Sequence, residues 1–290
     1  RNARTWVFKM IIWLASYPKS GNTLLRSMLS AYFFSKDGKF DFNLLGNIKQ
    51  FPENTVFKNL GIDINNEHEV VKNYIKVQEE INKRDGSTIR FLKTHSAMHD
   101  INGHPFTNLK NTLGVIYIVR DPRKIVNSYA NHSDISLIDA QNRILEVSTL
   151  GGKKELRNST IIHSGSWASN YNSWKVFKKV NKYLLVKYED LIEDPEKIFI
   201  SVVKFINKLT NSNYTLNNTK LKNTLDTTTF DYLQNLEKTN SFNESSSTKK
   251  GEIKFFKYGS KNDGKENVPD DLRNKIEKDL KFEMRELNYL

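Results

Sequence analysis

The chain has 290 residues, of which 38% are hydrophobic and 27% charged, and its net charge is +12. This composition supports one large domain with a substantial core, and the basic balance favours anionic partners such as nucleotides or sulfated glycans. The chain has no cysteine, which excludes disulfides, thiol catalysis and cysteine metal sites. A reducing compartment is therefore permitted, and we expect a cytoplasmic location.

The apolar run Met10–Ala15 is too short to cross a bilayer, which needs about 20 residues. The residues before it have no small-residue cleavage site of the kind that ends a signal peptide. We therefore expect no transmembrane segment in this chain, and an anchor preceding Arg1 stays open.

Apolar periodicity predicts strands that alternate with helices. Strands are predicted over residues 10–16, 88–93, 113–119 and 183–187, and helices over 23–34, 67–83, 123–131, 165–180, 196–209, 231–237 and 270–287. This alternation predicts an α/β fold with a mainly parallel central sheet flanked by helices. We expect a single domain over residues 1–290, with 1–9 as an extension and 239–268, rich in Ser, Asn, Lys and Gly, as a flexible lid segment.

A phosphate-binding loop is indicated directly after the first predicted strand, over residues 16–23. A tight turn that leads into a helix N-terminus directs backbone N–H groups at one spot, where the helix dipole favours an anion. Compared with the nucleotide-triphosphate loop, Asn22 replaces the usual lysine and the cation has moved to Lys19. The alternative is a surface turn of Pro, Ser and Gly. The position between a strand and a helix favours a P-loop-like phosphate site.

Two further candidate functional segments follow the next two predicted strands. His95 comes at the end of the second strand beside Lys93, where a histidine is suited to act as a general base. Arg120 ends the third strand, and Ser128 follows eight residues later; an arginine there can bind phosphate bidentately. Taken alone, His95 could equally be a structural histidine and Arg120 a surface ion-pair partner.

Together these segments resemble the PAPS-dependent sulfotransferase family of cytosolic and bacterial type. Residues 17–24 (YPKSGNTL) are similar to its 5'-phosphosulfate loop, residues 93–95 (KTH) to its second motif, and Arg120-Asp121-Pro122 with Ser128 to its 3'-phosphate motif. The resemblance implies that Lys19 stabilises the leaving phosphate and that His95 is the general base, assisted by Lys93. It also implies that Arg120 and Ser128 hold the 3'-phosphate.

The resemblance implies a larger set of donor-binding residues. They are Lys19, Ser20, Gly21, Asn22, Thr23, Leu24, Arg120, Ser128, Tyr188, Thr229, Phe230, Lys257, Tyr258 and Gly259. Leu24 stands where the family usually has a tryptophan that stacks on adenine. Lys257 stands for an arginine of the lid motif, and an alternative register places Lys249 and Lys250 there instead.

The sequence is thus similar to enzymes that move a sulfuryl group from 3'-phosphoadenosine 5'-phosphosulfate (PAPS) to an acceptor hydroxyl or amine. The resemblance implies in-line transfer without a metal. The alternatives are a P-loop-type nucleotide kinase and a catalytically inactive glycan- or nucleotide-binding module. No motif for binding nucleic acid is present.

The sequence leaves the acceptor and the oligomeric state open; we expect a small-molecule or glycan acceptor. Basic side chains in the least patterned segments would suit an acidic glycan, and aromatic ones would suit an apolar alcohol or phenol. The basic set is Lys153, Lys154, Arg157, Lys249 and Lys250, and the aromatic set is Phe40, Phe42, Phe51 and Phe242.

Overall fold

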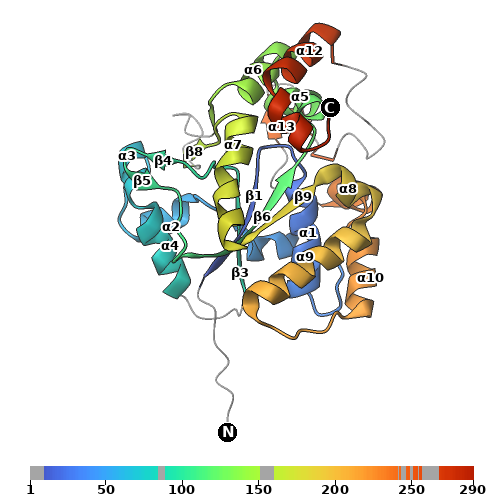
Figure 1. Cartoon of the computed structure of the whole chain (residues 1–290). Helices are drawn as coiled ribbons and strands as arrows, with labels where there is room; N and C mark the ends of the chain where they lie inside the picture. Colours follow the sequence, from blue (N-terminus) through green and yellow to red (C-terminus); the bar gives the residue numbers. More distant parts are fainter. Residues whose placement is uncertain are drawn as a thin grey trace.

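A central sheet of parallel strands runs through the molecule in the order β2-β3-β1-β6-β9 (Figure 1). The computed structural model describes residues 10–83, 89–150, 160–240, 242, 246–248, 251–253, 255–256 and 268–290. The strands of the sheet are β1 (Ile11–Ser16), β2 (Lys49–Gln50), β3 (Arg90–Thr94), β6 (Thr112–Val119) and β9 (Tyr183–Lys187). The pairings β2–β3, β3–β1, β1–β6 and β6–β9 are all parallel, so the predicted α/β fold is confirmed.

Helices cover both faces of this sheet. The α-helices are α1 (Asn22–Phe34), α2 (Asn54–Asn59), α3 (Glu67–Lys72), α4 (Tyr74–Lys83), α5 (Pro122–Ser133), α6 (Leu137–Leu145), α7 (Trp167–Trp174), α8 (Tyr188–Glu193), α9 (Pro195–Thr210), α10 (Asn218–Thr227), α11 (Phe230–Thr239), α12 (Asp270–Asp279) and α13 (Lys281–Glu286). The 3-10 helices are η1 (Phe42–Asn47) and η2 (Lys175–Val180). Short antiparallel pairs are formed by β4 (Asp100–Ile101) with β5 (His104–Pro105), β7 (Thr149–Leu150) with β8 (Ile162–His163), and β10 (Ser246–Thr248) with β11 (Gly251–Ile253).

The central strand β1 is buried on both faces, which is why its sequence is continuously apolar. Trp13 and its alternate neighbours pack on one face against a core that includes Trp174 of α7. Leu14 belongs to the other core, which α1 and α9 supply with residues such as Leu29 and Phe199. Burial of two apolar layers fixes the register of β1 against its neighbours, because a shift by one residue would exchange the two faces.

Several predicted helix boundaries were wrong where a polar residue or a tight turn interrupts the apolar pattern. The helix predicted over 67–83 is divided at Asn73, whose side-chain amide donates to the Glu69 carbonyl at 2.8 Å. The helix predicted over 165–180 continues as the 3-10 helix η2 after Trp174, and that over 270–287 is divided at Leu280. The helix α10 was not predicted, because it contains few apolar residues.

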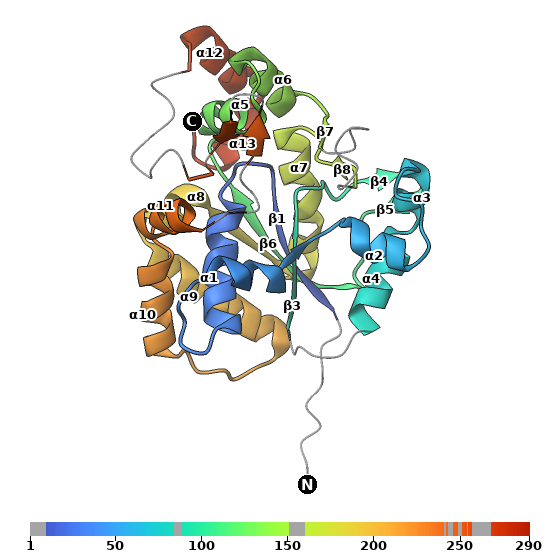
Figure 2. The ribbon, with the colours of Figure 1, turned by 180° about the vertical axis from the view of Figure 1, so that it is seen from behind.

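The C-terminal helices pack beside α5 and α6, as both views of the ribbon show (Figures 1 and 2). The buried Arg123 joins the two parts of the chain. Its Nε donates to Asp121 at 2.9 Å, its Nη1 to Glu277 at 2.5 Å, and its Nη2 to the Tyr289 carbonyl at 2.9 Å. The guanidinium therefore holds the start of α5 against α12 and the C-terminal residues.

We predict that Arg123→Ala lowers the free energy of unfolding by about 3 kcal/mol, because it leaves the buried Asp121 carboxylate without its partner. Chemical denaturation monitored by circular dichroism measures this loss. The matched control is Arg273→Ala, which removes the exposed pair with Asp270 and should cost less than about 1 kcal/mol. Equal losses in the two variants would contradict this account of Arg123.

Candidate active site

The three candidate segments expected from the sequence, which are the loop after β1, His95 and Arg120, lie together at the carboxyl edge of the sheet. The strand β1 lies between β3 and β6, with Leu14 opposite Lys93 and Ser16 opposite Ile118. The order of strands changes direction at β1, and the carboxyl ends on either side of such a point frame the usual ligand crevice of an α/β sheet. The residues that follow the strands, including His95 and Arg120, therefore gather there.

The loop between β1 and α1 has an unusual backbone. Lys19 has φ 64° and Gly21 has φ 94°, and both values lie in the left-handed region. A lysine in that region is uncommon and marks a segment whose shape is imposed by its surroundings. Ser20 is fully buried, and its Oγ has no hydrogen-bond partner among the described residues. The loop thus has a fixed shape and a buried polar atom to offer to a ligand.

Tyr188 connects the loop to Arg120. A Cβ atom added to Gly21 would lie 2.2 Å from Cδ2 of Tyr188, so only glycine allows the ring so close. The Arg120 guanidinium lies 4.4 Å from the centre of the same ring, and its Nη1 donates to the Lys19 carbonyl at 3.4 Å. Burial raises the pKa of Tyr188, partly offset by the Arg120 charge, so the phenol stays neutral at physiological pH.

His95 is held through both its ring and its main chain. Its Nδ1 lies 3.0 Å from the Ser16 carbonyl oxygen and 3.2 Å from Ser16 Oγ. Its own carbonyl accepts from Asn170 Nδ2 at 2.9 Å, and Tyr117 in turn donates to Asn170 Oδ1 at 2.7 Å. Lys93, two residues before His95, is only 6% exposed. The imidazole is therefore a positioned group and not a surface side chain.

The described part of the segment 239–268 contacts this site. The Lys19 ammonium lies 4.2 Å from the centre of the Phe255 ring. The backbone N–H groups of Phe255 and Phe256 both donate to the buried carboxylate of Glu237, at 2.6 and 2.9 Å. Lys257, Tyr258 and Gly259, and the alternative Lys249 and Lys250, lie outside the described residues.

The remaining predicted residues differ in what they contact. Leu24 and Phe230 both pack against a cluster of aromatic side chains, and the Thr229 hydroxyl accepts from Tyr232 N at 3.2 Å as the cap of α11. Ser128 lies partly exposed on α5. We call the phenylalanines of this region the aromatic cluster, which comprises Phe40, Phe42, Phe230, Phe242, Phe255 and Phe256.

Sequence reasoning assigned no specific role to four residues in or next to the candidate site: Ser16 in the predicted loop, Phe255 in the predicted lid segment, Asn170 and Glu237. The sequence pattern could have indicated Asn170, because it is a polar residue on the otherwise aromatic helical stripe formed by Trp167, Tyr171 and Trp174. Ser16 had a weaker signal, as the polar end of an apolar strand. Glu237 had none, because its bonds to Phe255 and Phe256 join two segments whose sequences show no pattern that links them.

The described ranges contain neither a metal-binding cluster nor a membrane-spanning helix. There, no group of three or more His, Asp or Glu side chains is arranged to hold a metal ion. No helix among the same residues has the length and apolar character needed to cross a membrane.

Comparison with known proteins identifies the type of domain. Residues 10–288 match the family model described as the sulfotransferase domain. The crystal structure of mouse sulfotransferase SULT7A1 complexed with PAP has a TM-score of 0.57 at 16% identity, covering 96% of this chain and 85% of the mouse protein. Retinol dehydratase in complex with androsterone and PAP has a TM-score of 0.61 at 13% identity, covering 95% and 81% of the two chains. At these identities the structures establish a shared fold.

We predict that Gly21→Ala destabilises the protein more than Gly61→Ala. Both glycines have positive φ, which costs an alanine about 1 kcal/mol, but only Gly21 also faces the Tyr188 ring. Relieving that contact should add a further cost of about 1–3 kcal/mol. Urea unfolding measures both losses, and the extra cost should disappear in a Tyr188→Ala background. If Gly21→Ala lowered the free energy of unfolding no more than Gly61→Ala does, the Tyr188 ring would be shown to move aside at no cost.

Proposed function

This chain belongs to the sulfotransferase domain family, and we propose that it catalyses PAPS-dependent sulfuryl transfer with His95 as the general base. The acceptor in this proposal is a hydroxyl or an amine, attacked in line. The observation that carries the proposal is the convergence of Lys19, His95 and Arg120, which follow three adjacent strands of one sheet, at a single edge.

The residues around the loop fit a donor with two anionic ends. Ser20 Oγ and Arg120 Nε are both buried and have no hydrogen-bond partner among the described residues, although buried polar atoms are normally paired. Oxygen atoms of phosphate and sulfate groups would satisfy both. We assign Lys19 and the backbone of residues 20–23 to the 5' end, Arg120 and Ser128 to the 3'-phosphate, and Tyr188, Leu24 and Phe230 to the nucleoside. PAPS, when bound, supplies a sulfuryl group on a phosphate leaving group.

The chain's own residues supply the proton and charge handling that this transfer needs. His95 takes the proton of the acceptor as the acceptor oxygen or nitrogen bonds to sulfur. The bond between sulfur and the bridging oxygen breaks, and its electron pair stays on the phosphate, where the Lys19 ammonium offsets the developing charge. Lys93 lies within β3, two residues before His95 and so on the same side of the strand, and adds a second cation beside the transferred group.

The two alternatives are less well supported. A kinase of related architecture would need a lysine where Asn22 stands, and the family match favours sulfuryl transfer. A binding module without catalysis would have no use for a histidine held at both ring and main chain. A cytoplasmic location stays a prediction.

The aromatic residues considered for an apolar acceptor are engaged elsewhere. Phe51 is 1% exposed in the main core, with its ring 5.7 Å from that of Trp13. Phe42 stacks on Phe242 with the ring centres 4.5 Å apart, and Phe40 packs edge-on against Phe42. The basic alternatives Lys153, Lys154 and Arg157 lie outside the described residues. The observations therefore lend no support to an acceptor pocket for a flat phenol.

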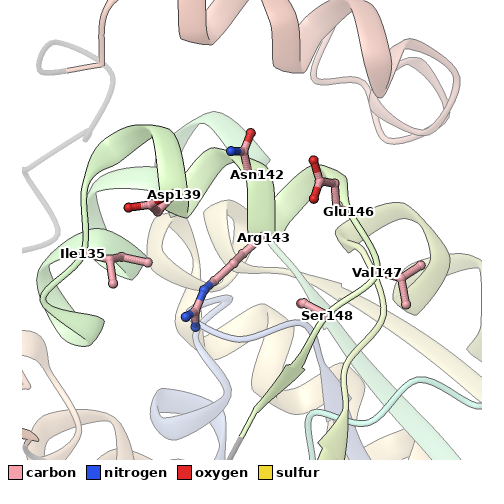
Figure 3. A pocket seen from close by; sticks show the side chains of 7 residues that line it. All are labelled: Ile135, Asp139, Asn142, Arg143, Glu146, Val147 and Ser148. Carbon is pink, nitrogen blue, oxygen red and sulfur yellow. The ribbon is translucent and has the colours of Figure 1, made fainter.

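A polar pocket adjoins the loop instead (Figure 3). Its volume is about 300 Å³, and its lining residues are Ile135, Asp139, Asn142, Arg143, Glu146, Val147 and Ser148. The Tyr17 hydroxyl donates to the Arg143 carbonyl at 2.7 Å, which joins this pocket to the phosphate loop. Asp139 and Glu146 lie on either side of Arg143 in Figure 3. We infer that the acceptor is a polar, neutral or amine-bearing molecule such as a sugar.

We predict that adenosine 3',5'-bisphosphate binds the parent chain without magnesium, and that Arg120→Ala weakens binding by about tenfold or more, because a charge-assisted hydrogen bond is lost. Isothermal titration calorimetry measures the dissociation constant, with Arg273→Ala as the surface-arginine control. His95→Gln should leave this constant unchanged and lower turnover by about 100-fold or more. Binding of ATP with magnesium in place of the bisphosphate would overturn the assignment of the site.

We predict that hydroxyl- and amine-bearing sugars are sulfated and that 4-nitrophenol is not. Replacing both pocket carboxylates (Asp139→Asn with Glu146→Gln) should raise KM for an amino sugar by about threefold, since exposed charge pairs are weak, with binding of the bisphosphate unchanged. The control is Asp226→Asn on α10, away from the pocket. Efficient sulfation of the phenol, unaffected by the double change, would refute the acceptor class.

A further inference from the structure

Asn22 occupies the position at which a nucleotide-triphosphate loop carries its lysine, yet its side chain does not face outward. Its Nδ2 donates to the Leu14 carbonyl at 3.0 Å and to Ser16 Oγ at 3.1 Å. Because a carbonyl oxygen only accepts, the first bond fixes which end of the amide is nitrogen. Both N–H bonds of the amide are therefore used inside the protein, and Asn22 is 3% exposed.

The Asn22 amide oxygen cannot bind an anion in place of the two N–H groups. Asn22 Oδ1 is buried and has no hydrogen-bond partner among the described residues. It is an acceptor, and an acceptor facing a phosphate or sulfate oxygen is repulsive. The side chain of Asn22 is thus unsuited to the donor, and any contact with the donor comes from its backbone N–H at the start of α1.

The contacts of Ser16 lead from this amide to the catalytic base. The register that pairs Ala15 with Thr94 continues by one residue and places Ser16 beside His95. The Ser16 carbonyl oxygen lies 3.0 Å from His95 Nδ1, nearer than Ser16 Oγ at 3.2 Å. If Nδ1 carried a lone pair, it would face the lone pairs of a carbonyl oxygen at contact distance. A proton on Nδ1 satisfies both Ser16 oxygens at once.

We propose that Asn22 and Ser16 are positioning residues that fix His95 in the tautomer with its proton on Nδ1. Nε2 then carries the lone pair that accepts the proton of the acceptor, and the Ser16 carbonyl stabilises the imidazolium that forms. Asn22 acts by holding Leu14 and Ser16 at the end of β1, so that the carbonyl stays directed at the ring. This inference rests on the proposed role of His95 as the general base.

The first test needs no turnover. Protein labelled with ¹⁵N-histidine is studied by long-range ¹H–¹⁵N correlation at pH 8, and the His95 signals are assigned by their loss in His95→Gln. We expect a protonated Nδ1 and an unprotonated Nε2 in the parent protein. A proton on Nε2 in the parent would overturn the proposal, whether or not the chain transfers sulfuryl groups.

The second test separates the base from the donor site. Asn22→Ala and Ser16→Ala should each lower kcat by about tenfold to 100-fold, because a small displacement of a catalytic group costs that much. In both variants the share of the Nε2–H tautomer should rise and the dissociation constant of adenosine 3',5'-bisphosphate should change by less than about twofold. Ser16→Thr, which keeps the hydroxyl, should restore most of the rate.

Matched controls test whether removing any buried polar side-chain group changes the His95 tautomer. Ser27→Ala removes a buried hydroxyl that donates to Thr23 O, and Asn82→Ala removes a buried amide that donates to Asn111. Neither should change the His95 tautomer. Asn22 would instead belong to the donor site if Asn22→Ala weakened bisphosphate binding about tenfold and left the tautomer unchanged, and that result would overturn the proposal. If the parent protein showed the expected tautomer but no turnover, the proposed sulfuryl transfer would be refuted and the proposal about the tautomer would stand.

Discussion

The parallel pairing of β1 with both β3 and β6 is the constraint on which the site depends. Parallel neighbours end at the same edge of the sheet. The loop after β1, His95 after β3 and Arg120 after β6 therefore all lie at that edge. The pairing itself is fixed by two apolar cores that clamp β1 from opposite faces. A one-residue slip would bury Ser16 among apolar side chains and turn Trp13 toward the wrong core. Core packing therefore sets the geometry of the proposed site.

A second set of contacts joins the site to the C-terminal residues. Tyr188 packs against Gly21, and the next residue, Glu189, accepts from Asp121 N at 3.1 Å and from the Tyr289 hydroxyl at 2.9 Å. The start of α8 thus faces the phosphate loop on one side and the end of the chain on the other. Because Asp121 directly follows Arg120, the same contacts fix the direction in which that arginine leaves β6. Burial at this end of the molecule supports the orientation of Arg120, which we propose to bind the 3'-phosphate.

The sequence allowed prediction of those features that local pattern determines. The strands over residues 11–16 and 112–119 are continuous apolar runs, and the loop between β1 and α1 has a turn composition at a helix start. The contact of Ser16 with His95 could not be predicted, because it requires the register of two strands 79 residues apart. The position of Phe255 over Lys19 depends on Glu237, whose burial has no local signal. Phe51, one of the aromatic residues that would suit an apolar acceptor, lies in the core, and core and pocket aromatics look alike in sequence.

The exchange of lysine for asparagine at position 22 has a physical consequence for the whole loop. A lysine there would extend toward the phosphates, whereas the amide is short enough to turn back and bond to Leu14 and Ser16. In the proposed site the cation is Lys19 instead, whose ammonium lies beside the Phe255 ring. In the proposed mechanism, one short segment thus supplies both the cation for the donor, Lys19, and the contacts of Asn22 and Ser16 that orient His95. In the proposed mechanism, this shared segment would therefore couple the position of the donor to that of the base.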